Sequence, residues 1–303
     1  MRIRSIQIEV TSACNLRCSI CWGRDMARPS GFMKLALFKK VVDEAAGMPR
    51  LRTLSLHFNG ESTIHPDFVE MLEYVGTKGF GRVEYTSNGM NVSDEVLLAT
   101  VKLPVAHVHF SAHGLHPEPP ETARRLRALR AEHGQGPRTS ANICWGGQPP
   151  EKMNEHFAQW YGVVDKFSLS GTIDEMAWTH LPNGFVERSQ PHCSQPFRYA
   201  AVLWDGSVTV CCHDLRGDLA SGNVNTDTLV NTVHEPYFVE LREQIRTQTT
   251  PEDCLCTKCD LWKVRYQFPV LKKPLPLDEP PGINRCGRTI IQTQRRLRLP
   301  VIS

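Results

Sequence analysis

Short apolar runs alternate with amphipathic stretches through the first 170 residues of the chain. Residues 4–10 and 51–58 have the polar–apolar alternation of half-buried strands, while residues 34–46 repeat apolar side chains with a helical period. The succession continues with strand patterns at 82–87, 105–112, 139–145 and 164–171 and helical patterns at 65–79, 93–101, 121–134 and 151–162. Six strand–helix units in series predict an α/β fold, a parallel sheet with outer helices that is either open or curled into a partial barrel.

The pattern changes near residue 190. Residues 197–212 predict two short strands joined by Asp205-Gly206, because this dipeptide tolerates the left-handed backbone of a tight hairpin turn. A helix is predicted from about Pro236 to Gln248, and residues 269–303, which hold six prolines, are expected to form an irregular tail. We therefore expect three parts, residues 1–185, 186–265 and 266–303.

Composition excludes several classes of protein. The chain has 303 residues, is 41% hydrophobic and 22% charged, and carries a formal net charge of +3. This balance gives no reason to expect nucleic acid or a membrane as a partner, and no apolar run approaches the roughly 18 residues that span a bilayer. The first residues, MRIRSIQIEV, alternate like a strand and do not resemble a signal peptide, so a cytoplasmic globular protein is expected.

The cysteines are the most informative part of this composition. The chain has 11 of them and no recognisable export signal. In a reducing compartment, so many thiols more often bind metal or take part in catalysis than pair as disulfides. They form three groups and two isolated positions: Cys14, Cys18 and Cys21; Cys193, Cys211 and Cys212; Cys254, Cys256 and Cys259; and, apart from these, Cys144 and Cys286.

The first group places three thiols on one short loop directly after the strand at 4–10. A structural zinc ion takes four ligands, usually as two separated pairs. Three clustered thiolates instead suit three irons of a cubane cluster, whose fourth iron stays open to an outside ligand. A zinc loop on an α/β domain is the alternative.

The spacing C-x3-C-x2-C after a first strand resembles that of the radical S-adenosylmethionine (SAM) superfamily. Further segments resemble the family at the ends of the following strands: Asn59-Gly60-Glu61, Ser87 and Asn88, Ser111, and Asn142. In the family, the first of these segments contacts the methionine amino group, and the last two positions contact the ribose and the carboxylate. The resemblance implies a partial (β/α)6 barrel, SAM binding, and a 4Fe-4S cluster held by Cys14, Cys18 and Cys21.

Two positions depart from the family's pattern. Ile20 stands where an aromatic residue often precedes the third cysteine, and Trp22 follows that cysteine. Asn59 stands where glycine is usual in the segment that contacts the methionine. These departures concern the surroundings of the cofactor and leave the three thiols unchanged.

The later cysteines resemble an auxiliary-cluster extension of the same superfamily, the Twitch form of the SPASM domain. A hairpin that presents Cys211 beside the loop of Cys256 and Cys259, together with Cys193, closes four thiolates around one 4Fe-4S cluster. With every iron bound by the protein, such a cluster has no open position and serves to move electrons or to tune a substrate.

Two alternatives stay open for this second group. Cys212 is the alternative to Cys211 as a ligand, because neighbouring residues on a strand face opposite sides. A four-thiolate zinc ribbon is the alternative to the cluster. Only Cys286 follows Cys259, so a single auxiliary cluster is expected.

The size and the ligand spacing resemble members of the superfamily that act in aminoglycoside biosynthesis. The resemblance implies a 5′-deoxyadenosyl radical that takes hydrogen from a carbinol carbon of a sugar or aminocyclitol, and a reductase of the flavodoxin or ferredoxin type. Epimerisation is the expected outcome, with Cys254 as hydrogen donor because it lies two residues before Cys256. Oxidation to a ketone, with the auxiliary cluster as electron acceptor, is the first alternative.

Two other classes of protein are considered. Modification of a ribosomal peptide is the second alternative, although no segment before Ile3 or after Cys259 resembles a peptide-recognition module. An iron–sulfur protein without enzymatic activity would not need the segment 59–61, Ser111 and Asn142. His107, His109 and His113 invite a zinc hypothesis, but no fourth ligand is spaced with them, and pocket lining or core packing is expected instead.

Overall fold

The centre of the molecule is a parallel sheet whose first six strands lie side by side in the order of the sequence. These strands are β1 (Ser5–Ile8), β2 (Thr53–Ser55), β3 (Val83–Ser87), β4 (Val105–Ser111), β5 (Arg138–Trp145) and β6 (Lys166–Gly171). The computed structural model describes residues 3–18, 21, 28–112, 118–145, 155–156, 158–171, 185–187, 193–259, 264–266, 282–283 and 289–292. The α/β fold predicted from the apolar pattern is confirmed.

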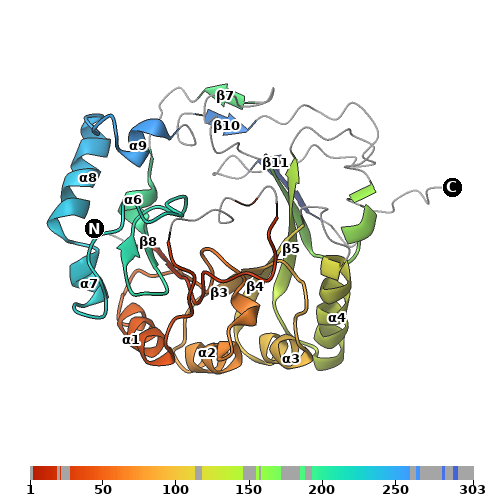
Figure 1. Cartoon of the computed structure of the whole chain (residues 1–303). Helices are drawn as coiled ribbons and strands as arrows, with labels where there is room; N and C mark the ends of the chain where they lie inside the picture. Colours follow the sequence, from red (N-terminus) through yellow and green to blue (C-terminus); the bar gives the residue numbers. More distant parts are fainter. Residues whose placement is uncertain are drawn as a thin grey trace.

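Helices connect the strands and cover one face of the sheet (Figure 1). They are α1 (Leu35–Ala46), α2 (Phe68–Gly76), α3 (Asp94–Lys102) and α4 (Glu118–His133), with the short 3-10 helix η2 (Ser62–Ile64) before α2. Their apolar sides form the core with the sheet. Phe68 of α2, for example, meets the ring of Tyr85 of β3 edge-on, with the centroids 5.3 Å apart. The helix predicted at 65–79 ends at Gly76, and Gly79 closes the following turn with φ 68°.

The two faces of the sheet differ in polarity, since alternate residues of a strand point to opposite sides. Apolar side chains face the helices and are buried, among them Ile6, Ile8, Leu54, Tyr85 and Phe110. On the inner face, the parallel register aligns polar residues in one row across β1 to β4: Gln7, Ser55, Glu84 and His107. The inner face therefore offers hydrogen-bonding groups and not an apolar packing surface.

His107 and His109 lie on this inner face of β4. Their rings stack with the centroids 4.0 Å apart and the planes inclined by 4°. Both rings hydrogen-bond to Ser140 Oγ, at 3.1 Å from His107 Nε2 and 2.8 Å from His109 Nδ1. The two histidines thus pack in the lining of the inner face, as expected, while His113 lies outside the described residues.

The predicted hairpin near residue 200 is confirmed, but it extends the main sheet. β8 (Tyr199–Val202) pairs in parallel with β1, and β9 (Val208–Thr209) pairs antiparallel with β8. The turn is built as Asp-Gly predicts: Gly206 has φ 91°, and Asp205 Oδ1 accepts a hydrogen bond from Ser207 N over 3.0 Å. Strands from both sides of the predicted domain boundary, β1 before it and β8 after it, therefore belong to one hydrogen-bonded sheet.

Among the residues that the structure describes in this later part, the helices are α6 (Gln195–Arg198), α7 (Leu229–Thr232), α8 (Pro236–Thr247) and α9 (Leu255–Lys258). α8 confirms the helix predicted from Pro236. Its inward side carries Phe238 and Leu241, both buried. α9 carries the last cysteine group into the structure, with Cys254 at its amino end.

The expectation of an irregular tail is wrong for part of residues 269–303. β12 (Thr289–Gln292) pairs antiparallel with β6, and β11 (Gly282–Ile283) pairs with β12. An open strand edge presents unpaired N–H and C=O groups, and a segment passing that edge satisfies them by adding a strand. β7 (Phe185–Glu187) and β10 (Val264–Tyr266) form a separate antiparallel pair.

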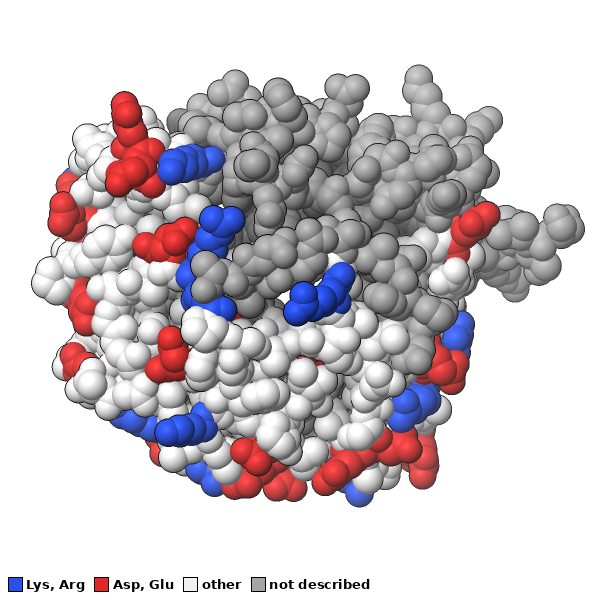
Figure 2. Space-filling view, viewed as in Figure 1, with Lys and Arg blue, Asp and Glu red and all other residues white. Residues whose placement is uncertain are grey.

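Charges of both signs are interspersed on the face shown in Figure 2, including the lower edge where α1 to α4 lie. Several form ion pairs, such as Lys39 with Glu70 and Lys78 with Asp43, each at 2.7 Å. Within the described ranges, no helix has the length and apolar character needed to cross a membrane.

Candidate iron–sulfur sites

The cysteine loop after β1 is closed at its base by the chain that returns from it. Ser12 N donates to Gly31 O over 3.0 Å, and Met33 N donates to Val10 O over 2.8 Å. Ser12 Oγ also accepts a hydrogen bond from Gly31 N at 3.0 Å. The loop therefore begins and ends at one anchored point beyond the end of β1.

Cys14, Cys18 and Cys21 lie on this loop, with Cys14 and Cys21 exposed and Cys18 half-buried. Burial raises the pKa of Cys14 and of Cys18, and the negative charge of a Cys21 thiolate raises both further. The three side chains are thus close enough to repel one another when deprotonated. A group with several positive metal centres relieves that repulsion, so the donor set fits the predicted cluster.

The segment Asn59-Gly60-Glu61 packs directly against the cysteine loop. Gly60 has φ 71°, and a β-carbon on it would lie 2.5 Å from Ala13 O and 2.6 Å from Thr11 O. Glu61 N donates to Ala13 O over 2.8 Å. Only glycine allows this approach, because any side chain would collide with the backbone that leads into the cysteines.

The Glu61 carboxylate is buried, with 1% of its residue surface exposed, and it organises the neighbouring loops. It accepts hydrogen bonds from Asn88 N over 2.6 Å and from Thr63 Oγ1 over 2.6 Å. Burial raises the pKa of Glu61, and these hydrogen bonds oppose the rise. The carboxylate thus ties the loop after β3 to the segment after β2.

The remaining predicted SAM contacts fall into two groups. Ser87 is buried and accepts a hydrogen bond from Gly89 N at 2.9 Å, so it holds the turn after β3. Ser111 and Asn142 are partners in the register of β4 and β5 on the polar inner face, and both are partly exposed. The structure therefore places Ser111 and Asn142 side by side, and their contacts with SAM stay a prediction.

The four predicted auxiliary ligands also gather. Burial raises the pKa of Cys211 well above its usual range, and the charges of Cys212, Cys193 and Cys259 add to the rise. Burial likewise raises the pKa of Cys256, with contributions from Cys193 and Cys259. These mutual effects place Cys193, Cys211, Cys256 and Cys259 within electrostatic reach of one another. Cys212 shares this neighbourhood, and its sulfur accepts a hydrogen bond from Gln195 Nε2 over 3.5 Å.

Cys254 stands at the amino end of α9, where its backbone N–H donates to Pro251 O over 3.1 Å. Burial and then the negative charge of Cys254 raise the pKa of Cys256, so the two side chains are close. Burial raises the pKa of Tyr237 on α8, and negative charge on Cys254 and Cys256 adds to this rise. The structure thus places Cys254 beside the auxiliary thiols, as expected from its spacing.

The arrangement of thiols bears on the zinc alternatives. Among the residues that the structure describes, no three His, Cys, Asp or Glu side chains converge closely enough to hold one metal ion. A cubane cluster does not need such convergence, because each thiolate binds a different iron. Both cysteine sets therefore have the donor chemistry that iron–sulfur clusters require.

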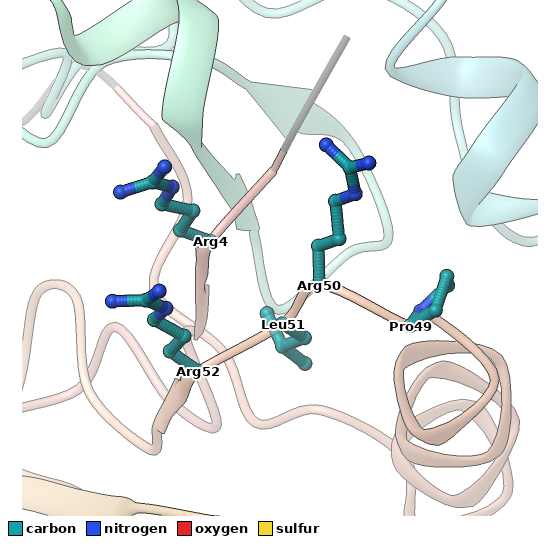
Figure 3. A pocket seen from close by; sticks show the side chains of 5 residues that line it. All are labelled: Arg4, Pro49, Arg50, Leu51 and Arg52. Carbon is teal, nitrogen blue, oxygen red and sulfur yellow. The ribbon is translucent and has the colours of Figure 1, made fainter.

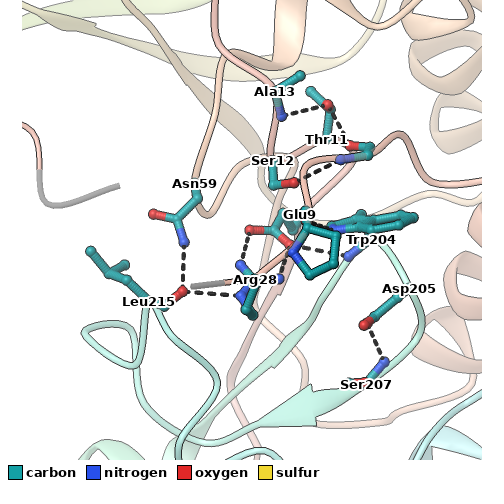
Figure 4. Close-up of polar contacts among 12 residues, drawn as sticks. Glu9, Thr11, Ser12, Ala13, Arg28, Asn59, Trp204, Asp205, Ser207 and Leu215 are labelled. Atoms are coloured by element: carbon teal, nitrogen blue, oxygen red, sulfur yellow. Dashed lines mark hydrogen bonds and ion pairs between the residues drawn. The ribbon is translucent and has the colours of Figure 1, made fainter. Parts of the chain in front are cut away.

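A buried junction that the sequence did not predict joins the segment after the first cysteine loop to the loop that follows Cys211 (Figure 4). Glu9, at the end of β1, has no exposed surface and forms an ion pair with Arg28, which follows the cysteine loop, over 2.8 Å. Arg28 Nε and Asn59 Nδ2 both donate to Leu215 O. The polar–apolar alternation of residues 4–10 assigns Glu9 to a solvent-facing position, and no local signal marks it as buried.

A cationic hollow lies at the opposite end of β1. Arg4, Arg50 and Arg52, with Pro49 and Leu51, line a space of about 380 Å³ (Figure 3). Arg4 precedes β1, whereas the cysteine loop follows it, so this hollow is separate from the first cysteine set.

Family comparison agrees with both sites. A profile of the Radical SAM superfamily matches residues 8–151, and a profile of SPASM, an iron–sulfur cluster-binding domain, matches residues 193–260. The first match contains Cys14, Cys18 and Cys21, and the second contains the later cysteine groups.

Curated relatives match over part of the chain. The tungsten-containing aldehyde ferredoxin oxidoreductase cofactor-modifying protein of Pyrococcus furiosus is 35% identical over 109 residues, which is 36% of this chain and 30% of that protein. The mycofactocin maturase MftC of Mycobacterium tuberculosis is 29% identical over 107 residues, 35% of this chain and 26% of that protein. The matched stretch thus spans less than a third of either relative.

Solved structures share the fold over most of the chain. SuiB of Streptococcus suis, bound to its precursor peptide SuiA, has a TM-score of 0.66 and 13% identity, covering 88% of this chain and 71% of that one. BtrN in complex with AdoMet and 2-DOIA has a TM-score of 0.52 and 18% identity, covering 87% and 92%. The family profiles thus identify a radical SAM domain at residues 8–151 followed by a SPASM-type iron–sulfur domain at residues 193–260, and the solved structures share this fold.

Proposed function

We propose that this protein is a radical SAM enzyme that abstracts a hydrogen atom from a peptide substrate. The observation that carries the radical SAM part is the contact of Gly60 and Glu61 with Ala13, which joins the predicted methionine-binding segment to the cysteine loop. When bound at Cys14, Cys18 and Cys21, the first cluster supplies the electron that cleaves SAM to methionine and a 5′-deoxyadenosyl radical.

We assign the remaining roles in SAM binding and cluster binding to the following side chains. Ser111 and Asn142, side by side on the inner face, are proposed to hydrogen-bond the ribose and the carboxylate of SAM. Gly60 keeps the proposed methionine-binding segment close to the cysteine loop that would hold the first cluster, and Asn88 donates a hydrogen bond to Cys14. Cys193, Cys211, Cys256 and Cys259 are proposed to hold one auxiliary cluster. A reductase of the flavodoxin or ferredoxin type is the proposed electron source.

The relatives support a peptide as the substrate class. SuiB is known in complex with a precursor peptide, and MftC is a maturase of mycofactocin. The polar inner face agrees with such a substrate, because His109, whose side chain is 30% exposed there, carries an imidazole that can hydrogen-bond a peptide backbone. This peptide hypothesis replaces the aminoglycoside hypothesis as our main proposal.

Hydrogen abstraction from a carbinol carbon of a sugar or aminocyclitol is the second candidate. It is favoured by the likeness to BtrN, which binds 2-DOIA and of which this chain covers 92%. In this case Cys254, beside Cys256, is the proposed hydrogen donor for epimerisation. Oxidation to a ketone with the auxiliary cluster as acceptor is the other outcome of the same step.

The test uses anaerobically reconstituted protein reduced in the presence of SAM. Formation of 5′-deoxyadenosine is expected, and a protein in which Cys14, Cys18 and Cys21 are replaced by alanine should form none. Failure of the reconstituted protein to form it contradicts the radical SAM proposal.

The substrate class is tested in deuterated water with two sets of compounds, candidate peptides and aminocyclitols. A peptide that raises 5′-deoxyadenosine formation and changes in mass supports the main proposal. An aminocyclitol that gains solvent deuterium at one inverted carbon supports the second candidate, and loss of that deuterium in Cys254→Ala supports thiol donation.

A further inference from the structure

One backbone carbonyl, Leu215 O, joins the loop that follows Cys211 to two segments that lie near the first cysteine loop. Leu215 O accepts a hydrogen bond from Arg28 Nε over 3.0 Å and another from Asn59 Nδ2 over 3.4 Å (Figure 4). Arg28 belongs to the segment that returns from the cysteine loop, and Asn59 belongs to the segment after β2. Leu215 O therefore connects the loop after Cys211 both to the segment of Arg28 and to the segment of Asn59.

Arg28 is held in place by a buried carboxylate. Its two terminal nitrogens donate to the two oxygens of Glu9, over 3.1 Å to Oε2 and 2.8 Å to Oε1. Glu9 has no exposed surface, and the Arg28 side chain is only 12% exposed. Because a paired, two-point contact of guanidinium with carboxylate fixes the plane of the guanidinium, the third nitrogen, Nε, is aimed at Leu215 O.

The hairpin of the auxiliary part is attached to the same pair. Trp204 N, at the tip of the β8–β9 hairpin, donates to Glu9 Oε2 over 3.2 Å. The indole Nε1 of Trp204 donates to Pro29 O over 3.2 Å, and the indole ring lies so close to Gly31 that a β-carbon there would be 2.5 Å away. The hairpin tip and the Leu215 loop are thus two separate attachments to the stem of the first cysteine loop.

The Leu215 loop is too well ordered to absorb a shift. Asp214, with 1% of its surface exposed, accepts hydrogen bonds from Thr209 Oγ1 over 2.6 Å, Asp218 N over 2.8 Å and Leu219 N over 3.1 Å. These bonds connect the loop back to β9. Cys211 lies in the chain between β9 and Asp214, so the hydrogen bonds that hold Leu215 and Asp214 also restrain the segment that carries Cys211.

We propose that Arg28, together with Glu9 and Asn59, is a positioning residue that fixes the auxiliary-cluster loop against the SAM-cluster loop. The inference rests on the proposed function, since it takes the Cys14 and Cys211 loops to hold the two clusters. Asn59 adds a feature of this chain: glycine, usual in the family at this position, has no amide side chain to reach Leu215 O. In this proposal the junction fixes the distance between the two clusters, on which electron transfer between them depends.

The test uses the protein with both clusters reconstituted and compares Arg28→Gln, Asn59→Ala and a matched control, Arg130→Gln. Arg130 forms an ion pair with Asp165 at the same 2.8 Å but lies on α4, outside the junction. Hydrogen–deuterium exchange of the backbone amides of residues 213–219 is measured by mass spectrometry. Both junction variants should exchange at least about tenfold faster there, with residues 94–102 of α3 unchanged.

A second readout separates positioning from general stability. Pulsed electron paramagnetic resonance on the doubly reduced protein reports the spin–spin interaction between the two clusters. In Arg28→Gln and Asn59→Ala the distribution of this spin–spin interaction should be broader than in the wild type. The iron content of both variants should equal that of the wild type and of Arg130→Gln. A merely structural role would lower the iron content or the thermal stability and leave a single spin–spin interaction.

Each outcome of these measurements either supports or overturns the proposed role of the junction. Unchanged exchange at 213–219 in both junction variants, or an unchanged spin–spin interaction, overturns the proposal. If Arg28→Gln fails to fold or to bind iron, Asn59→Ala, which removes one side-chain amide and no charge, decides alone. Absence of 5′-deoxyadenosine in the wild type would contradict the proposed function, while the exchange of residues 213–219 would still test the junction.

Discussion

The side-chain amide of Asn88 donates a hydrogen bond to the sulfur of Cys14 over 3.6 Å, although 74 residues separate them in the chain. The same amide donates to Asn15 Oδ1 over 2.8 Å, so it is oriented toward the cysteine loop. A hydrogen bond to a cluster sulfur stabilises the reduced, more negative state. We therefore expect Asn88 to influence how readily a cluster bound at Cys14 accepts an electron.

Replacing Asn88 by Asp should lower the reduction potential of the first cluster. The substitution removes the donor and adds a negative charge next to Cys14, and we expect a shift of at least about 60 mV, a tenfold change in a one-electron equilibrium. A redox titration followed by electron paramagnetic resonance measures it. Asn91→Asp, which adds the same charge at an exposed position nearby, is the control, and equal potentials in the two variants would contradict the role of Asn88.

Gly60→Ala should dislocate the cysteine loop, whereas Gly79→Ala should not. The two glycines have nearly the same φ, 71° and 68°, but a β-carbon meets Ala13 O and Thr11 O at Gly60 and nothing within 4 Å at Gly79. Gly79→Ala is expected to cost about 1–2 kcal/mol of unfolding free energy from backbone strain alone. Gly60→Ala should cost at least about 2 kcal/mol more and lose iron from the first site, because the backbone it meets cannot move away.

Thermal unfolding and iron content measured on both proteins separate the two effects. Equal losses of stability and equal iron contents would show that the close approach at Gly60 has no importance beyond its φ angle.

Cys211→Ala and Cys212→Ala should differ in iron content. Cys211 is the predicted ligand, and its sulfur accepts a hydrogen bond from His213 N over 3.4 Å, whereas Cys212 bonds to Gln195. Cys211→Ala is expected to lose about half of the iron, since one of two clusters loses a ligand, while SAM is still cleaved. Cys212→Ala should keep both clusters, and the reverse pattern in iron analysis would reassign the ligand to Cys212.

Acid should destabilise the protein partly through His107. Burial, with smaller effects from His109 and Arg82, lowers the pKa of His107 to about 3. Because the unfolded chain has a histidine pKa of about 6.5, it binds the proton more readily than the folded protein does, and stability falls as pH drops from 6.5 toward 3. Between pH 7 and pH 5 this linkage amounts to about 2 kcal/mol.

Urea unfolding of His107→Gln at these two pH values should therefore show a smaller loss of stability than the wild type shows. His133→Asn, at an exposed position on α4, serves as the control. A wild-type pH dependence that persists in His107→Gln would assign the acid sensitivity to another group.

Local patterns were sufficient for much of the fold. The period-two alternation at residues 4–10 and the apolar repeat at 34–46 predicted β1 and α1, because burial of one face of a strand or helix leaves a direct trace in the order of residues. Asp205-Gly206 predicted its hairpin for an equally local reason, the backbone angles that the turn requires. The irregular tail was the failure, since β12 forms only because it meets the edge of β6.

One part of the candidate site was likewise predictable from the sequence, and another part depends on the tertiary structure. The spacing of Cys14, Cys18 and Cys21 determined the donor chemistry of the first site without any structure, because three thiols on one loop are neighbours by covalent connection. Tertiary structure alone decided that β8 joins β1, and that Arg28 reaches Leu215 across 187 residues. Such contacts follow from the packing of distant segments, and neither Glu9 nor Arg28 has a local pattern that distinguishes a buried ion pair from two solvated charges.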